Sequence, residues 1–252
     1  MDVEATHLEI VDALKRAGTP YPTGGSDNDS YSGSNHPFFF VSVPERRSII
    51  GWVVRANKSA SDAELLGLAD RLFRGVSHEE KTLGAILLER SAPARRLATL
   101  PMLDAWLGEL NGWAEIDSLC SGVFKPDEIA AAWPAWKAFL QRLAGDANIN
   151  KRRASLVLLT AAARSTDDPR FRDLAFELVE RLKGERHIMI TKAVSWLLRS
   201  MAGQHGPAVA AYLEANAASL PAIAVRETRV KLATGTKSGR SRRVGDGGRN
   251  AG

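Results

Sequence analysis

The chain has 252 residues, of which 44% are hydrophobic and 25% charged, and Cys120 is its single cysteine. This composition excludes a collagen-like or wholly disordered chain, and no run of about 18 apolar residues is present that could cross a membrane. A lone cysteine excludes an intrachain disulfide or a thiolate metal site. Together with an N-terminus that lacks the layout of a secretory signal, it predicts a cytoplasmic protein.

The net charge of +5 is concentrated at the C-terminal end. Residues 226–252 hold eight basic and two acidic side chains, a net charge of +6, which leaves about −1 for the rest of the chain. The body is therefore nearly neutral. Nucleic-acid binding there would require basic side chains to collect on one face.

The N-terminal region predicts one helix followed by a loop. Leu8, Val11 and Leu14 have helical spacing, and a run of Gly, Ser, Asp and Asn at 24–30 ends the pattern. The apolar run from residue 37 to residue 43 has no neighbouring segment that would pair with it as a strand. We therefore expect a buried connection there.

From Pro44 onward the pattern predicts one helix after another, about 12–18 residues long and joined by short links. Residues typical of helix starts are Ser61 with Glu64 and Ser77 with Glu80, both at capping-box spacing, and the first-turn prolines Pro126 and Pro169. Apolar stripes at helical spacing are Leu65, Leu68, Ala69 and Leu72; Leu83, Ile86 and Leu87; and Leu174, Leu178 and Leu182. These signals indicate an all-α fold.

A faint internal repeat favours one all-α architecture over another. Residues 149–157 can be laid over residues 190–198 at an offset of 41. Helix-pair repeats of the HEAT or armadillo kind have periods of about 40–47 residues and stack into curved solenoids. We therefore expect a HEAT-like helical-repeat solenoid with a concave face for an extended ligand, in preference to a compact bundle.

The composition changes after Leu232. The segment that follows is rich in Gly, Ser and Arg, and Val244 is an isolated aliphatic residue within it. Such a segment cannot bury enough apolar surface to fold. We predict one domain over residues 1–234 and a disordered basic tail over residues 235–252, which either attracts DNA or only aids solubility.

Several familiar chemical sites are absent from the sequence. His78-Glu79-Glu80-Lys81 lacks the second histidine of a zinc protease, and the five histidines are scattered. The segment 234–239 has the composition of a phosphate loop but follows no strand. No metal and no cofactor are expected.

Three segments carry residues suited to DNA chemistry. Trp113 and Asp117 are four apart, so on a helix they share a face, where an indole and a carboxylate can stabilise a developing cation. Three consecutive basic residues, 151–153, cannot all share one face, and Trp196 lies in an otherwise apolar helix. Each segment also has a purely structural interpretation: a core tryptophan with a surface aspartate, a solvated charge run, and packing between repeats.

Taken together, these segments resemble the AlkD-type alkylpurine DNA glycosylases, DNA alkylation repair proteins built from HEAT-like repeats. The resemblance runs from about Tyr31 to about Leu232. Its markers are Tyr31, Pro44-Glu45-Arg46-Arg47, Trp113 with Asp117, Arg153 within Lys-Arg-Arg-Ala, and Trp196 within Lys-Ala-Val-Ser-Trp-Leu-Leu-Arg. The chain departs from some members at Gly112, where they carry a second aromatic residue.

The resemblance implies a role for each marker. Asp117 would be the catalytic carboxylate, Trp113 and Trp196 would flank the deoxyribose of the lesion, and Arg153 would support the site or its phosphates. Tyr31 would be a further aromatic residue near the cleft. The resemblance and the local charge also suggest four basic DNA contacts: Lys151, Arg152, Lys192 and Arg199.

The sequence gives no sign of oligomer-forming heptads and no membrane segment, so we expect a monomer that is not bound to a membrane. The resemblance further implies a nucleoid-associated enzyme that acts on duplex DNA without a metal. It would hydrolyse the N-glycosidic bond of cationic purines such as 7-methylguanine and 3-methyladenine, with the lesion left largely stacked. Residues 151–199 hold eleven basic and six acidic side chains, as a basic groove would require. Two alternatives remain: a non-catalytic HEAT-repeat protein that binds bent or branched DNA, and a protein-binding scaffold.

Overall fold

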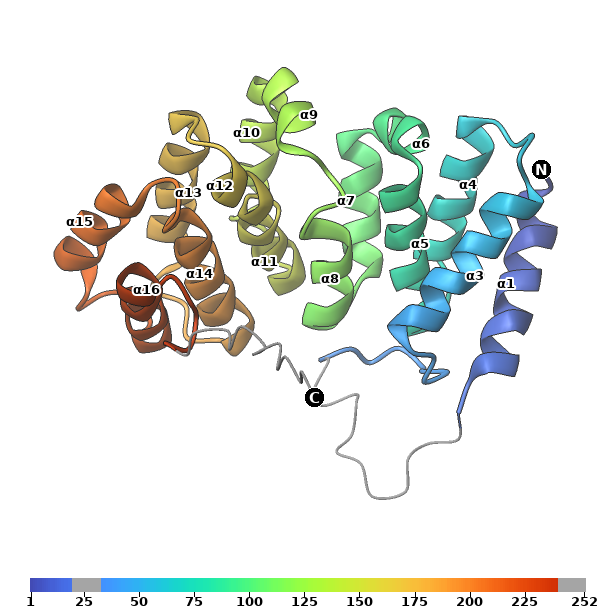
Figure 1. Cartoon of the computed structure of the whole chain (residues 1–252), viewed down its shortest axis with the longest axis horizontal. Helices are drawn as coiled ribbons and strands as arrows, with labels where there is room; N and C mark the ends of the chain where they lie inside the picture. The colour runs from blue at the N-terminus through green and yellow to red at the C-terminus, as the bar shows by residue number, and fades with distance from the viewer. Residues whose placement is uncertain (20–32, 240–252) are drawn as a thin grey trace, which may run out of the picture. The chain divides into compact units, whose positions relative to one another are not determined.

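The computed structural model describes residues 1–19 and 33–239, and within these ranges every regular element is a helix (Figure 1). The expected all-α, helical-repeat fold is confirmed. The chain divides into two compact units, residues 1–162 and 163–252, which are described separately here. No helix of the described ranges is long and apolar enough to cross a bilayer.

The first unit begins with α1, and from α3 onward its helices are joined by short links. Its helices are α1 (Val3–Ala17), α3 (Val43–Ala56), α4 (Asp62–Phe73), α5 (His78–Arg90), α6 (Ala92–Leu97), α7 (Leu100–Glu109), α8 (Gly112–Cys120), α9 (Pro126–Ala131), α10 (Trp133–Leu143) and α11 (Ile149–Val157). Helix α4 packs on α1, α5 and α6, α5 packs on α3 and α8, and α11 packs on α7, α8 and α10. The short helix α12 (Thr160–Ser165) contains the division between the units.

In the second unit, as far as residue 239, the helices that follow α12 are α13 (Pro169–Leu182), α14 (Ile188–Met201), α15 (Gly206–Asn216) and α16 (Ala222–Thr234). Helix α14 packs on the other three. Helix α16 ends at Thr234, and Gly235 caps it in the left-handed conformation with a φ of 69°. The tail over residues 235–252 remains a prediction, because residues 240–252 lie outside the described part of the chain.

The helix starts follow the predicted capping chemistry. Capping boxes are present at Ser61 with Glu64 and at Ser77 with Glu80, and a third, at Ser42 with Glu45, begins α3. Prolines lie in the first turns of α9 and α13, as predicted. In each box the serine hydroxyl accepts a first-turn amide and the glutamate accepts the amide of the cap residue, so two otherwise unpaired donors are satisfied.

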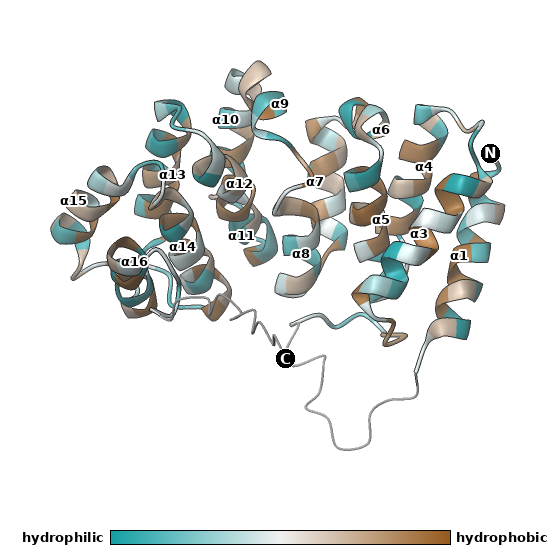
Figure 2. Ribbon diagram, viewed as in Figure 1, coloured by the Kyte–Doolittle hydropathy of each residue, from teal (hydrophilic) through white to brown (hydrophobic). Residues whose placement is uncertain are grey.

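Several helices are amphipathic, most clearly α1, α10, α13 and α14, and they carry both hydrophobic and hydrophilic residues (Figure 2). The leucine stripes of α4 and α13 are buried as predicted. The helix predicted from Leu8, Val11 and Leu14 is confirmed as α1, in which Leu8 is 56% exposed and Ile10 and Leu14 are fully buried. Helix α1 packs on α3 and α4 through the side that carries Ile10 and Leu14.

The predicted connection before α3 is confirmed as irregular chain, since residues 37–42 form neither helix nor strand. Its burial is only partial. Val41 is buried, Phe38 to Phe40 are half-buried, and Val43 is already the first residue of α3.

Arg95 of α6 forms hydrogen bonds with residues of α5 and α9, and these bonds give a prediction on stability. Its guanidinium donates two hydrogen bonds to Glu128, of 3.0 and 2.7 Å, and a third to the Leu88 carbonyl, of 3.3 Å. Arg95 is 4% exposed. We expect Arg95→Ala to lower the free energy of unfolding by about 3 kcal/mol, because it removes the buried partner of the Glu128 carboxylate and leaves the Leu88 carbonyl without this donor.

Arg96 is the matched control. It reaches the same carboxylate at 3.4 Å from a side chain that is 65% exposed. Arg96→Ala should cost less than about 1 kcal/mol. Urea unfolding curves of the two variants measure the difference, and equal losses would contradict this account of Arg95.

Candidate nucleic-acid interface

The central feature of the candidate site is an ion pair between α8 and α11. Arg153 Nε donates to Asp117 Oδ1 at 2.9 Å and Arg153 Nη2 donates to Asp117 Oδ2 at 2.8 Å. The two residues are 36 apart in sequence and meet because α8 packs on α11. The parallel two-bond geometry fixes the plane of the carboxylate.

This carboxylate is largely withdrawn from solvent. The Asp117 side chain is 15% exposed and the Arg153 side chain 5%. Burial raises the pKa of Asp117 above its ordinary value, and the hydrogen bonds and charge of Arg153 oppose that rise. Each carboxylate oxygen keeps a second lone-pair direction beyond its bond to Arg153. The pair can therefore still act on a positive charge or on a water molecule.

Trp113 lies one turn before Asp117 on α8 and is half-buried. The helix begins directly before it, at Gly112, which is buried and has a φ of 73°. Since this left-handed conformation favours glycine, it gives a physical reason for the departure from the aromatic residue found in some relatives. The predicted helical spacing of Trp113 and Asp117 is confirmed.

The neighbouring basic residues of α11 have protein partners. Lys151 Nζ lies 2.9 Å from Asp104 Oδ1. Arg152 Nη1 donates to the carbonyls of Asp146 at 2.7 Å and Ala147 at 2.8 Å. The three consecutive basic residues thus point to three different partners, as the prediction that they cannot share one face requires.

The remaining predicted site residues do not belong to α8 or α11. Trp196, Lys192 and Arg199 are on α14 of the second unit, where Trp196 is half-buried and Lys192 is exposed. Arg199 lies 3.2 Å from Glu227. Tyr31 lies outside the described residues.

A pocket of about 210 Å³ lies among residues of α3, α5 and the C-terminal end of α8. Its lining includes Arg46, Arg47, Glu89, Ser118 and Ser121. Within the described ranges neither arginine has an ion-pair partner, although Arg46 donates to Thr82 Oγ1. From the sequence, both arginines were only markers of a resemblance. The packing of three helices places them beside a pocket.

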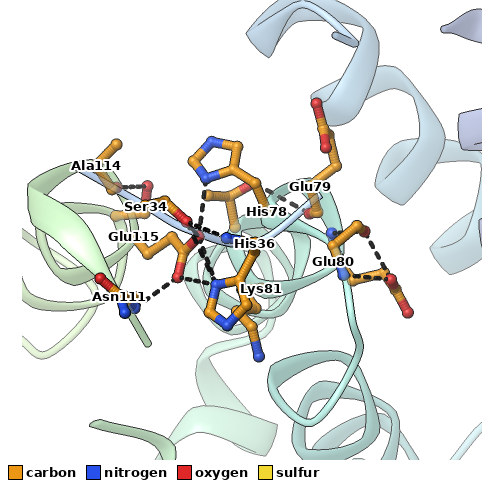
Figure 3. A network of polar contacts seen from close by, with 12 residues as sticks. Ser34, His36, His78, Glu79, Glu80, Lys81, Asn111, Ala114 and Glu115 are labelled. Atoms are coloured by element: carbon orange, nitrogen blue, oxygen red, sulfur yellow. Dashed lines mark hydrogen bonds and ion pairs between the residues drawn. The ribbon is translucent and has the colours of Figure 1, made fainter. Parts of the chain in front are cut away.

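The sequence analysis also missed a buried polar cluster around Glu115, two residues before Asp117 (Figure 3). The Glu115 carboxylate accepts hydrogen bonds from Ser34 Oγ at 2.6 Å and from the Asn111 amide at 2.7 Å. The Nδ1 atoms of His36 and His78 lie 3.0 and 3.1 Å from it. Although burial opposes the shift, these donors lower the pKa of Glu115 to about 2, so the group is ionised at neutral pH.

No group of three or more His, Cys, Asp or Glu residues in the described part of the chain could hold a metal ion. The residues that carry chemistry are thus the shielded carboxylate and the indole of α8, the guanidinium of α11, and two pocket-lining arginines, Arg46 and Arg47, that have no ion-pair partner in the described ranges. Such a set can stabilise positive charge and contact phosphates. These groups lie on an all-helical repeat fold.

The comparison with family models identifies the family. The model described as DNA alkylation repair enzyme matches residues 19–232, so the chain belongs to that family and has a role in the repair of alkylated DNA. Among solved structures, the chain is similar to a protein described as a predicted DNA alkylation repair enzyme from Enterococcus faecalis. The two share 17% identity with a TM-score of 0.67, over 86% of this chain and 98% of that one, which shows a common fold. No curated protein matches.

Proposed function

We propose that this member of the family is a DNA glycosylase that hydrolyses the N-glycosidic bond of cationic alkylated purines in duplex DNA. The observation that supports this most strongly is the shielded Asp117 carboxylate, held in a fixed plane by Arg153. Purines of the 7-methylguanine and 3-methyladenine type are already cationic, so they leave without a general acid.

Departure of the base builds positive charge on the deoxyribose. A carboxylate beside that sugar stabilises the charge, and the effect is strongest where water is excluded. Asp117 would provide this stabilisation and would orient the attacking water through a lone pair that Arg153 does not use. Arg153 would keep the carboxylate in position rather than touch the base.

The indoles would act on the same charge. An indole face attracts a nearby cation by about 0.5–2 kcal/mol, depending on desolvation. Trp113 shares the α8 face of Asp117, and we assign it to the deoxyribose. Trp196 and Tyr31 are proposed to contribute further aromatic contacts.

DNA binding would rest on phosphate contacts, with little sequence preference. Lys192 is exposed and suited to such a contact. Lys151, Arg152 and Arg199 would have to exchange the partners they have in the protein, so each should contribute less. No metal or cofactor is part of the proposal, and the protein is proposed to act as a monomer.

The test is direct. Methylated duplex DNA is incubated with the protein, and the released bases are identified by chromatography. The proposal requires free 7-methylguanine or 3-methyladenine above spontaneous depurination. Tight binding of the DNA without base release would instead identify a non-catalytic protein that recognises bent or branched DNA, and no binding would identify a protein scaffold.

The pocket beside α8 gives a prediction on DNA affinity. Arg47 is exposed, lines that pocket and has no ion-pair partner in the described ranges. If it contacts a phosphate, Arg47→Ala should reduce the slope of log affinity against log salt by about 1.

Arg16, an exposed residue of the last turn of α1, provides the matched substitution. Arg16→Ala should leave the slope unchanged. Fluorescence anisotropy with a short duplex at several salt concentrations gives both values. An unchanged slope for Arg47→Ala would remove this pocket from the proposed interface.

A further inference from the structure

The segment from residue 33 to residue 41 is irregular chain that is fastened by side chains and amides of α5. Glu79 accepts hydrogen bonds from the amides of Phe39 at 3.0 Å and Val41 at 3.2 Å. The His78 amide donates to the Pro37 carbonyl at 2.9 Å. The Phe38 ring also stacks on the His78 ring, with centroids 4.5 Å apart. This segment, called the N-terminal strap below, is thus held to the start of α5.

Glu115 extends this attachment to α8. Its side chain is fully buried. As Figure 3 shows, it lies between Ser34 and His36 of the N-terminal strap, His78 of α5 and Asn111 at the start of α8. One carboxylate therefore joins three separate parts of the chain. Glu79, Glu80 and Lys81 are the other charged side chains of α5 labelled in the same view.

The start of α8 depends on this carboxylate. Helix α8 has only nine residues, and the side chain of its cap residue, Asn111, makes no capping hydrogen bond. Instead, Glu115 accepts the Asn111 amide. A helix this short has little stability of its own in water, so outside contacts set its position.

The N-terminal strap also touches the start of α8 directly. Gly33 has a φ of 67°, and a Cβ atom on it would lie 3.5 Å from the Gly112 Cα and 4.0 Å from the Trp113 amide nitrogen. Trp113 and Asp117 follow within the next five residues. Glu115 thus connects the N-terminal strap to the start of the helix that carries the proposed reactive groups.

We propose that Glu115 is a positioning residue: with Ser34, His36 and His78 it locks the N-terminal strap to the start of α8 and so holds Trp113 and Asp117 in place for the chemical step. The proposal rests on the proposed glycosylase function. A small displacement of a reacting group slows chemistry far more than it weakens binding. A slower chemical step with an unchanged Kd therefore indicates a positioning role, whereas a higher Kd indicates the loss of a DNA contact.

The test uses Glu115→Gln, which keeps the shape of the side chain but removes its charge. Single-turnover base release should slow by about 10- to 100-fold, whereas the Kd for duplex DNA should stay within about threefold. Amide hydrogen exchange at 111–117 and at 33–41 should become faster. Ser34→Ala removes one donor and leaves the other three in place, so it should show the same pattern with a smaller loss.

Glu80 supplies a matched control. Its carboxylate is also buried, and it accepts hydrogen bonds from Ser77 and pairs with His7 at 2.8 Å, whereas in the described ranges no hydrogen bond or ion pair joins it to α8. Glu80→Gln should lower stability without slowing base release in fully folded protein. Equal rates for the Glu115 and Glu80 variants, or a loss of DNA affinity that accounts for the Glu115 effect, would overturn the proposal.

Two further outcomes are decisive. If Glu115→Gln does not fold, Ser34→Ala gives the answer: an unchanged rate together with unchanged exchange overturns the proposal. If the wild-type protein releases no base, the proposed function fails. Amide hydrogen exchange in the Glu115 and Glu80 variants then still shows whether Glu115 holds the start of α8. Equal exchange rates at 111–117 in the two variants would overturn that role.

Discussion

The Asp117→Asn variant should bind methylated duplex DNA as tightly as the wild type and release the methylated base about 10²- to 10³-fold more slowly, the usual cost of removing one group that stabilises transition-state charge. Asparagine has nearly the same shape but no charge. Its amide also presents a donor to Arg153, which already donates to both oxygens. Single-turnover release from a duplex with one 7-methylguanine measures the effect.

Asp104→Asn is the matched control for this experiment. Asp104 is also a partly buried aspartate, and it pairs with Lys151 at 2.9 Å and Arg142 at 3.3 Å, but it lies on α7. Its loss should leave the rate of base release nearly unchanged. A comparable slowing by both substitutions would point to a general loss of charge balance and against a specific role of Asp117.

Arg153→Ala should have the second-largest effect, because it acts on both stability and catalysis. It leaves the buried Asp117 carboxylate unpaired, which typically costs about 3–5 kcal/mol. It also removes the group that opposes the rise in the pKa of Asp117. Thermal unfolding should report the first effect.

The pH dependence should report the second. In the proposed mechanism base release needs ionised Asp117, so the rate should fall as the pH drops through the pKa of this carboxyl, which burial places above its ordinary value. Without Arg153 that pKa rises further, and the fall in rate should begin at a higher pH. Arg153→Lys keeps the charge and should restore most of the wild-type profile. An unchanged profile in Arg153→Ala would contradict the coupling of the two groups.

Local features of this fold could be predicted because they depend on neighbouring residues. The capping boxes at Ser61 and Ser77 were predicted from a spacing of three, and the burial of Leu65, Leu68 and Leu72 from helical periodicity. Periodicity does not show which side of a helix its neighbours cover. In α1, for example, Leu8 and Leu14 both belong to the helical spacing that predicts the helix, yet Leu8 is exposed and Leu14 is buried.

The site was predictable only in part. Asp117 and Arg153 were proposed as separate residues on the strength of a resemblance, and only the packing of α8 on α11 shows that they form a pair. The residues from His78 to Lys81 have the charges of an exposed turn. They are buried because α5 packs on α3, α4, α6 and α8 and the N-terminal strap covers its first turn.

The central claim is that positive charge builds on the deoxyribose while the cationic purine leaves under the influence of Asp117. The most direct measurement compares single-turnover release of 7-methylguanine from duplexes with hydrogen or deuterium on C1′ of the damaged nucleotide. This account predicts slower release from the deuterated sugar, because that carbon flattens as its bond to the base breaks. Equal release from the two duplexes, or no release from either, would contradict it.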